Sequence, residues 1–208
     1  MSYPEATSFD GMILWWGSMD GPTAIPGDYQ VTLTHNGHEM NQPFKIKGNP
    51  NLSVSDQEYA AQFDFIQSVN SKVTEAHEAI IEMRSIKEQL HKYKDIVKDD
   101  EEIKKGISDV DSTLTVIEEA LYQTKNQSRQ DPLNFPIRLT NKLAHLNSLT
   151  QIGVAPPTQG AIEVRDELVA QIDEYLRQYD IVKKISIPGI NQLIREAQVD
   201  YIIIDDDE

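Results

Sequence analysis

Residues 55–97 have the sequence SDQEYAAQFDFIQSVNSKVTEAHEAIIEMRSIKEQLHKYKDIV, which predicts one very long amphipathic helix. Ser55 followed by Glu58 has the spacing of a capping box, which marks the first helical turn. From there apolar residues recur every three or four positions, over roughly 60 Å at about 1.5 Å per residue. The members of this stripe are Tyr59, Phe63, Ile66, Val69, Val73, Ala76, Ile80, Met83, Ile86, Leu90, Tyr93 and Val97.

Three further apolar stripes follow the first one. Asp99 or Asp100 can cap the second helix, and Thr158 can cap the fourth. Four stripes with short connectors predict an antiparallel four-helix bundle over residues 51–208, which includes a short helix in IPGINQLIREAQ. The last run, VDYIIIDDDE, favours either an added strand or a solvated acidic tail. The later stripes are Ile103, Ile107, Val110, Leu114, Ile117, Leu121 and Thr124, then Leu139, Leu143, Leu146 and Leu149, then Val164, Leu168, Ile172, Tyr175, Tyr179 and Val182.

Residues 1–50 have a different pattern, with Gly and Pro punctuation and an apolar period of two. GMILWWG predicts a short strand, and DYQVTLTHNGHEMNQPFKIKG predicts a hairpin with Asn36-Gly37 as a type I′ turn. These strands form a small antiparallel β unit, too small to close a β-sandwich. PGDYQVTL resembles the penultimate strand of an immunoglobulin-like domain, with Tyr29 placed as a corner tyrosine. That resemblance places the earlier strands upstream of Met1.

The connector QDPLNFP between the second and third helices is longer and more particular in sequence than a simple turn requires. Asp131-Pro132 prevents the helix from continuing, because the residue before a proline is pushed out of the α region. Leu133 and Phe135 are expected to be apolar anchors that plug one end of the bundle. If Phe135 is fully buried there, its replacement by alanine should cost roughly 3–5 kcal/mol.

Charge and composition restrict the classes of partner. The net charge of −15, from 34 acidic and 19 basic residues, disfavours nucleic acid and anionic membranes. There is no cysteine, so a disulfide framework, a thiolate zinc site and a cysteine nucleophile are excluded. The first residues lack the features of a signal peptide, and no segment has the roughly 20 apolar residues that span a bilayer. The chain itself therefore indicates no compartment.

Several polar residues have chemistry-bearing side chains, but their spacing favours structural roles. His35 and His38 flank the turn on one face, while Glu39 alternates to the other, so a third metal ligand is missing. Glu118 and Glu119 point about 100° apart on a helix, unlike the paired carboxylates of a glycosidase. His77 and His145 lie beside apolar stripes, where a half-buried, hydrogen-bonded imidazole is the ordinary interpretation. We therefore expect no catalytic residue, no metal and no cofactor.

The candidate interaction surface consists of apolar side chains. Trp15 and Trp16 are neighbours in a predicted strand, so one should enter the core and the other should face outward. The outward tryptophan is expected to contact another domain or the bundle, or alternatively to stack on a sugar ring. The long first helix can outrun its neighbours, which would leave Tyr93 and Val97 uncovered for self-association.

Three segments carry a resemblance to a known family: GPTAIPGDYQVTLTHNG, QFDFIQSVNSKVTEAHEAI and IEEALYQTKNQSRQDPLNFPIRLTNKLAHL. They resemble the C-terminal region of large exported bacterial proteins with a sortilin/VPS10-like or BNR-repeat β-propeller, often labelled glycosyl hydrolases. The resemblance implies an order of propeller, immunoglobulin-like strands and helical bundle, in a periplasmic or extracellular parent protein. The Asp-box motif S-x-D-x-G-x-T-W of such propellers is not present, so a propeller activity does not transfer to these residues.

The sequence thus favours a non-catalytic accessory module that packs, spaces or assembles a β-propeller protein, either by contact with the propeller or by self-association. Two alternatives stay open. One is a carbohydrate-binding module that uses Trp15 or Trp16. The other is a free-standing helical adaptor that binds a protein partner.

Overall fold

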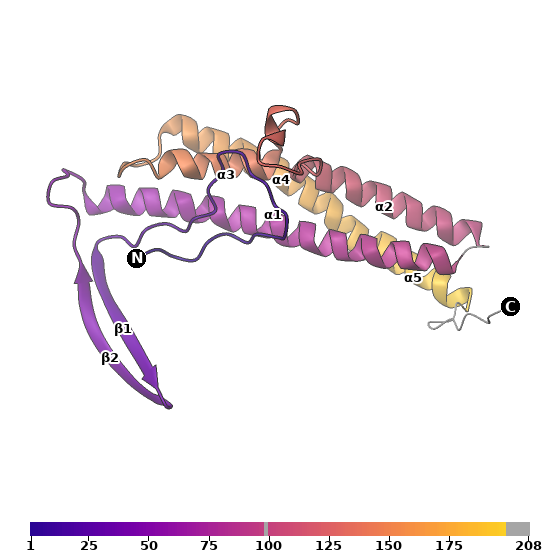
Figure 1. Cartoon of the computed structure of the whole chain (residues 1–208), viewed down its shortest axis with the longest axis horizontal. Coiled ribbons are helices and arrows are strands. Elements are labelled where there is room, and N and C mark those ends of the chain that lie inside the picture. Colours follow the sequence, from indigo (N-terminus) through magenta and orange to yellow (C-terminus); the bar gives the residue numbers. More distant parts are fainter. Residues whose placement is uncertain (98–99, 199–208) are drawn as a thin grey trace.

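The computed structural model describes residues 1–97 and 100–198, and confirms a mainly helical bundle preceded by a small two-stranded β unit (Figure 1). The prediction for VDYIIIDDDE, residues 199–208, lies outside these residues. Within the described ranges, no helix has both the length and the apolar character needed to cross a bilayer. The elements are β1 (Gly27–His35), β2 (His38–Ile46), α1 (Asp56–Ile96), α2 (Glu101–Leu121), α3 (Leu139–Thr150), α4 (Gln159–Ile181) and α5 (Ile187–Glu196).

The helix α1 extends over 41 residues and forms the backbone of the bundle (Figure 1). Its predicted capping box is present: the Glu58 carboxylate accepts the Ser55 N–H at 2.8 Å, and the Glu58 N–H donates to the Ser55 hydroxyl at 3.3 Å. The stripe of apolar residues faces the interior, where Val69, Ile80 and Met83 are completely buried. Local pattern alone therefore specifies this element.

The helices α2 and α3 both run opposite to α1, one after the other along its length (Figure 1). Arg84 of α1 donates to Glu118 of α2, and Lys94 of α1 donates to Ser108 of α2. Residue numbers increase along α1 as they decrease along α2, so the two helices are antiparallel. On the α3 side, Gln62 reaches the carbonyl of Thr150 at 2.6 Å. Each half of α1 is thus covered by a different helix.

The helix α4 runs parallel to α1, because its ion pairs advance in the same direction along both helices. Lys72 contacts Asp173 of α4 at 2.6 Å, and Glu82 contacts Lys183, just beyond the end of α4, at 2.7 Å. The parallel orientation follows from the path of the chain (Figure 1). The helices α2 and α3 together lead the chain back along α1, so α4 begins near the N-terminal end of α1. A cross section through the bundle accordingly contains α1, α4 or α5, and one of α2 and α3.

The predicted terminal helix is present as α5, but it continues from α4 through one π-helical turn at residues 182–186. The N–H of Ile187 reaches the carbonyl of Val182, five residues earlier. Pro188 explains this widening, because a proline ring in an α-helix clashes with the carbonyl four residues before it and donates no hydrogen bond. The turn lets the helix pass the proline, and Ile190 and Ile194 then remain buried.

The connector between α2 and α3 does not plug an end of the bundle, as the sequence suggested. It projects from the middle of the molecule, where the two helices meet end to end (Figure 1). Leu133 is 68% exposed and Phe135 is only half-buried. The connector is held instead by polar bonds: the Asp131 carboxylate accepts the N–H groups of Gln127 and Ser128, and these bonds lower the pKa of Asp131.

Phe135→Ala should therefore cost about 1–2 kcal/mol of unfolding free energy, below the roughly 3–5 kcal/mol of a fully buried phenylalanine. The reason is that the half-buried ring already contacts water in the folded protein. Urea denaturation followed by circular dichroism measures the difference. A loss of 3 kcal/mol or more would show that the ring is enclosed in solution.

Residues 11–17 do not form the predicted strand. Residues 1–24 instead make an extended loop that folds back on itself and lies along the bundle (Figure 1). Tyr3 donates to the Pro22 carbonyl and Ala6 to the Met19 carbonyl, each at 2.9 Å. Gly21 permits this close approach, since a Cβ at that position would lie 2.0 Å from the Tyr3 carbonyl oxygen.

The predicted hairpin is confirmed. β1 and β2 pair antiparallel with His35 opposite His38, and Asn36 and Gly37 have φ angles of 48° and 78°. Positive φ at both central residues is the requirement of a type I′ turn. The hairpin extends away from the helices (Figure 1), so most of its residues are exposed.

Candidate functional site

Polar side chains of α3 hold the tryptophan pair of the N-terminal loop. The Asn141 side-chain oxygen accepts the Trp15 N–H at 2.8 Å, and its amide donates to the Trp15 carbonyl, also at 2.8 Å. The Trp16 carbonyl accepts hydrogen bonds from Ser148 Oγ at 2.6 Å and His145 Nδ1 at 3.0 Å. Side chains on one face of α3 therefore make four hydrogen bonds to the backbone of two consecutive residues, Trp15 and Trp16.

This binding imposes an uncommon backbone conformation on Trp16, whose φ is 57°. A bulky residue rarely adopts the left-handed region, so the surrounding hydrogen bonds must maintain it. Gly17 allows the loop to approach α3, because a Cβ there would lie 3.0 Å from the Ala144 Cβ. Trp16 is 70% exposed, while Trp15 is half-buried. One tryptophan faces outward, as expected. The cause is the tight backbone bend at Trp16, because residues 11–17 do not form a strand.

A second polar contact joins α1, α3 and the loop inside the bundle. The Asn147 amide donates to Asn70 Oδ1 at 2.9 Å and lies 3.2 Å from the carbonyl oxygens of Ser18 and Asp20. Asn70 donates to the same Asp20 carbonyl at 2.9 Å. Both asparagines are buried. The side-chain amides of Asn70 and Asn147 thus join α1 and α3 to the backbone of the loop at Ser18 and Asp20.

His77 makes a third contact with the loop, from the middle of α1. Its ring is completely buried, and Nδ1 donates to the Thr7 carbonyl at 2.6 Å. Nε2 is enclosed and has no hydrogen-bond partner. The Phe9 ring contacts the imidazole edge to face, with centroids 5.2 Å apart. Burial lowers the pKa of His77 below its ordinary value of 6.5, despite the bond to Thr7. The imidazole is therefore neutral at pH 7.

Acidification should consequently destabilise the fold through His77. The unfolded chain takes up a proton near pH 6.5, before the folded chain does, so stability is complete above 6.5 and falls as the pH drops toward the lowered pKa. We expect the thermal midpoint to decrease in this range, above the ordinary carboxyl pKa of 4.5. His77→Gln should flatten the profile. Equal slopes for both proteins would contradict a titration of this histidine.

Glu118, one of the two candidate carboxylates, is a buried ion-pair partner. Its oxygens lie 2.7 Å from Arg84 Nε and 3.1 Å from Lys87 Nζ, and its side chain is 5% exposed. The Arg84 guanidinium also stacks over Phe9, at 4.5 Å, and Tyr122, at 5.7 Å. This arrangement joins α1, α2 and the loop. Glu119, its neighbour on α2, is half-buried.

The hairpin histidines occupy the positions that the sequence predicted. His35 and His38 are opposite each other and exposed, and Asn36 lies 3.1 Å from His35 Nε2. Glu39 pairs with Thr34 on the other face. Within residues 1–97 and 100–198, no three histidine or carboxylate side chains gather as metal ligands.

The prediction that Tyr93 and Val97 are uncovered is wrong. Val97 is 4% exposed, and Tyr93 is half-buried against the core. The physical reason is the shortness of the connection: α2 begins at Glu101, capped by Asp100, and its first buried residue, Ile103, lies in the same core as Val97. The end of α1 is thus covered by α2.

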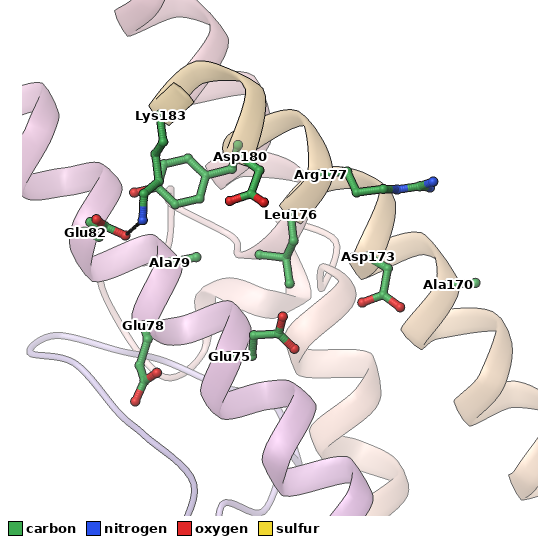
Figure 2. A pocket seen from close by; sticks show the side chains of 11 residues that line it. Glu75, Glu78, Ala79, Glu82, Ala170, Asp173, Leu176, Arg177, Asp180 and Lys183 are labelled. Carbon is green, nitrogen blue, oxygen red and sulfur yellow. Dashed lines mark hydrogen bonds and ion pairs between the residues drawn. The ribbon is translucent and has the colours of Figure 1, made fainter. Parts of the chain in front are cut away.

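A hollow with a volume of about 710 Å³ lies between α1 and α4 (Figure 2). Glu82 and Lys183 meet across it, and this bond lowers the pKa of Glu82. Lys72 joins α1 to Asp173 nearby. These charges are paired with one another, so the groove is explained by ion pairs that fasten the two helices together.

The asparagines that hold the loop were missed by the sequence patterns. Asn70, Asn141 and Asn147 each fall on a buried helical face, although asparagine is a poor helix former that prefers caps and turns. That conflict is the signal that could have identified them. Neither a protein-family model nor a curated protein nor a solved structure matches this chain.

Proposed function

We propose that the chain is a non-catalytic accessory module: a helical mount that holds a β unit in a fixed orientation for contact with a larger protein. One observation carries this proposal. The buried polar side chains of α1 and α3 bind the backbone of residues 7–20, which leads into the hairpin. The side-chain oxygen and nitrogen atoms of Asn141 and Asn147 are all hydrogen-bonded, and buried polar groups satisfied in this way favour a single arrangement. The cost of burying them is explained if the position of the hairpin matters.

The resemblance described above supports a β-propeller protein of the sortilin/VPS10-like class as the larger protein. The three quoted segments cover the entry to the hairpin, the first half of α1 and the connector with α3. Those are the parts that meet around the N-terminal loop. In this proposal the bundle packs against or spaces the propeller, and the loop and hairpin form the junction.

A distance measurement tests the mount. The chain contains no cysteine, so Lys45→Cys on β2 and Gln89→Cys on α1 provide two unique sites for spin labels. We expect a narrow distance distribution between the labels, and a broad one after Asn141→Ala removes the clamp on Trp15. A distribution that is equally broad before and after that change would overturn the proposal.

A carbohydrate-binding role is the second candidate, because the exposed Trp16 borders a hollow of about 440 Å³. Residues 12–15, Arg129 and Gln130 line the remainder, which combines apolar contact with hydrogen-bond donors. Electrophoresis in gels that contain soluble polysaccharides tests this role. Retardation that is lost in Trp16→Ala but kept in Val116→Ala, a control at an exposed apolar residue of α2 outside the hollow, would favour it.

A further inference from the structure

The hairpin has one apolar and one polar face. Residues opposite each other in an antiparallel pair point to the same side, and the register places Tyr29 opposite Phe44 and Leu33 opposite Met40. Val31 lies between them on that face, opposite Gln42, and the His35–His38 pair ends the same face at the turn. The exposed fractions of Val31, Leu33 and Met40 are 53%, 58% and 64%. The opposite face contains the pairs Asp28–Lys45, Gln30–Pro43, Thr32–Asn41 and Thr34–Glu39. We call the first set the apolar hairpin face.

The two edges of the hairpin differ in their capacity to pair with another strand. With a two-residue turn, His35 and His38 exchange hydrogen bonds, and every second pair after them does so too. The intervening residues therefore direct their N–H and C=O groups outward. On β1 these are Asp28, Gln30, Thr32 and Thr34; on β2 they are Glu39, Asn41, Pro43 and Lys45.

Pro43 has no N–H, so the outward row of β2 is interrupted near its centre. Proline on an edge strand is a common protection against further pairing. The outward row of β1 has all its donors and acceptors. The β1 edge is thus the edge at which a sheet can grow, and the β2 edge is where it ends.

The start of β1 has a contact that is typical of β-sandwiches. The Tyr29 hydroxyl donates to the Ile25 carbonyl at 2.8 Å, four residues upstream. This is the geometry of a tyrosine corner, which occurs in β-sandwiches where a strand enters from the other sheet. The Tyr29 ring stacks on Phe44 with centroids 5.8 Å apart, and together they close the base of the apolar hairpin face.

The charge of the hairpin permits close approach by another sheet. Residues 27–47 contain two acidic residues, Asp28 and Glu39, and two basic ones, Lys45 and Lys47, so their net charge is zero. The whole chain has a net charge of −15. The hairpin, which extends away from the helices (Figure 1), therefore does not share the strong negative charge of the chain as a whole.

We propose that the hairpin is the terminal pair of strands of a β-sandwich whose other strands come from a partner polypeptide. One partner strand pairs with the β1 edge, and a facing sheet covers the apolar hairpin face. This inference rests on the proposed function, because it names the chemistry of the junction between the mount and the larger protein. It assigns the docking to one edge and one face of a two-stranded element.

The test uses a strand probe: a soluble nine-residue peptide of alternating threonine and valine, with a lysine at each end. Titration into the ¹⁵N-labelled chain should shift the amide signals of Gln30, Thr32 and Thr34. Thr32→Pro removes an outward N–H of β1 and should weaken binding at least tenfold. Asn41→Pro, directly opposite, removes an outward N–H of β2 and should change binding less than twofold.

A second pair of variants tests the face without altering the backbone. Leu33→Lys should weaken binding at least fivefold, and Thr34→Lys, its neighbour on the polar face, should not. Hairpin amide signals confirm that each variant is folded. Shifts confined to β2, or no binding at millimolar peptide, would overturn the inference. Self-association that Thr32→Pro abolishes would also overturn it, because the occupant would then be a second copy. A narrow label distance alongside any of these results would leave the mount intact.

Discussion

Arg84→Met is expected to lower the free energy of unfolding by about 3 kcal/mol, because it leaves the carboxylate of Glu118 buried with only Lys87 nearby. Methionine keeps the length and apolar character of the stem, so the loss reports the charge more than the packing. The stacking of the guanidinium on Phe9 and Tyr122 is lost as well. Guanidinium chloride would screen the effect, so urea denaturation is the appropriate measurement.

A second substitution separates the buried charge from the other losses. In the double variant Arg84→Met, Glu118→Gln, the side chain at position 118 no longer carries a charge. We expect the double variant to recover about half of the unfolding free energy that Arg84→Met loses. Lys92→Met is the matched control, because Lys92 pairs with Glu88 on the exposed side of the same helix. It should cost less than about 0.5 kcal/mol. An equal loss in Lys92→Met and Arg84→Met would refute the role of the buried pair.

Asn147→Ala is expected to cost about 2–3 kcal/mol and to loosen the N-terminal loop. The change removes the donor to Asn70 Oδ1 and to the carbonyl oxygens of Ser18 and Asp20, and buried polar groups without partners are costly. The loop should then open more often than the bundle unfolds. Chymotrypsin, which cleaves after aromatic residues, should cut at Phe9, Trp15 or Trp16 at least tenfold faster.

Asn191→Ala provides the control for that experiment, since Asn191 is exposed on α5, away from the loop. It should leave both the stability and the cleavage rate within error of the parent chain. If Asn147→Ala lowers the stability but leaves cleavage at the loop unchanged, the amide stabilises the pairing of α1 with α3 and does not fasten the loop.

The elements that the sequence predicted correctly depend on neighbouring positions in the chain. The capping box at Ser55 needs only Glu58, the hairpin turn needs only Asn36 and Gly37, and the apolar period of α1 repeats within each turn. Such patterns survive in almost any tertiary context. The helical bundle and the small β unit followed from them.

The errors concern contacts between distant parts of the chain. The run around Trp15 has strand propensity, but Asn141 satisfies its backbone and bends it, and these residues lie 126 positions apart. Val97 belongs to an apolar stripe that the spacing predicts to outrun its partner, but α2 begins four residues later and covers it. The sequence predicts that Phe135 is buried at one end of the bundle. Because α2 and α3 meet end to end, their connector does not lie at an end of the bundle, and Phe135 is only half-buried. Tertiary partners decided each case.

The passage of α1 along the whole bundle has a mechanical consequence. The hairpin is attached at one extremity of the molecule and the end of α5 lies at the other (Figure 1). Tension between these points acts along the helix axes, so the rows of ion pairs and apolar contacts between α1 and α4 are loaded in shear. Many contacts must then break together before the helices slide. A tether of this shape resists stretching far better than one whose helices are peeled apart sequentially.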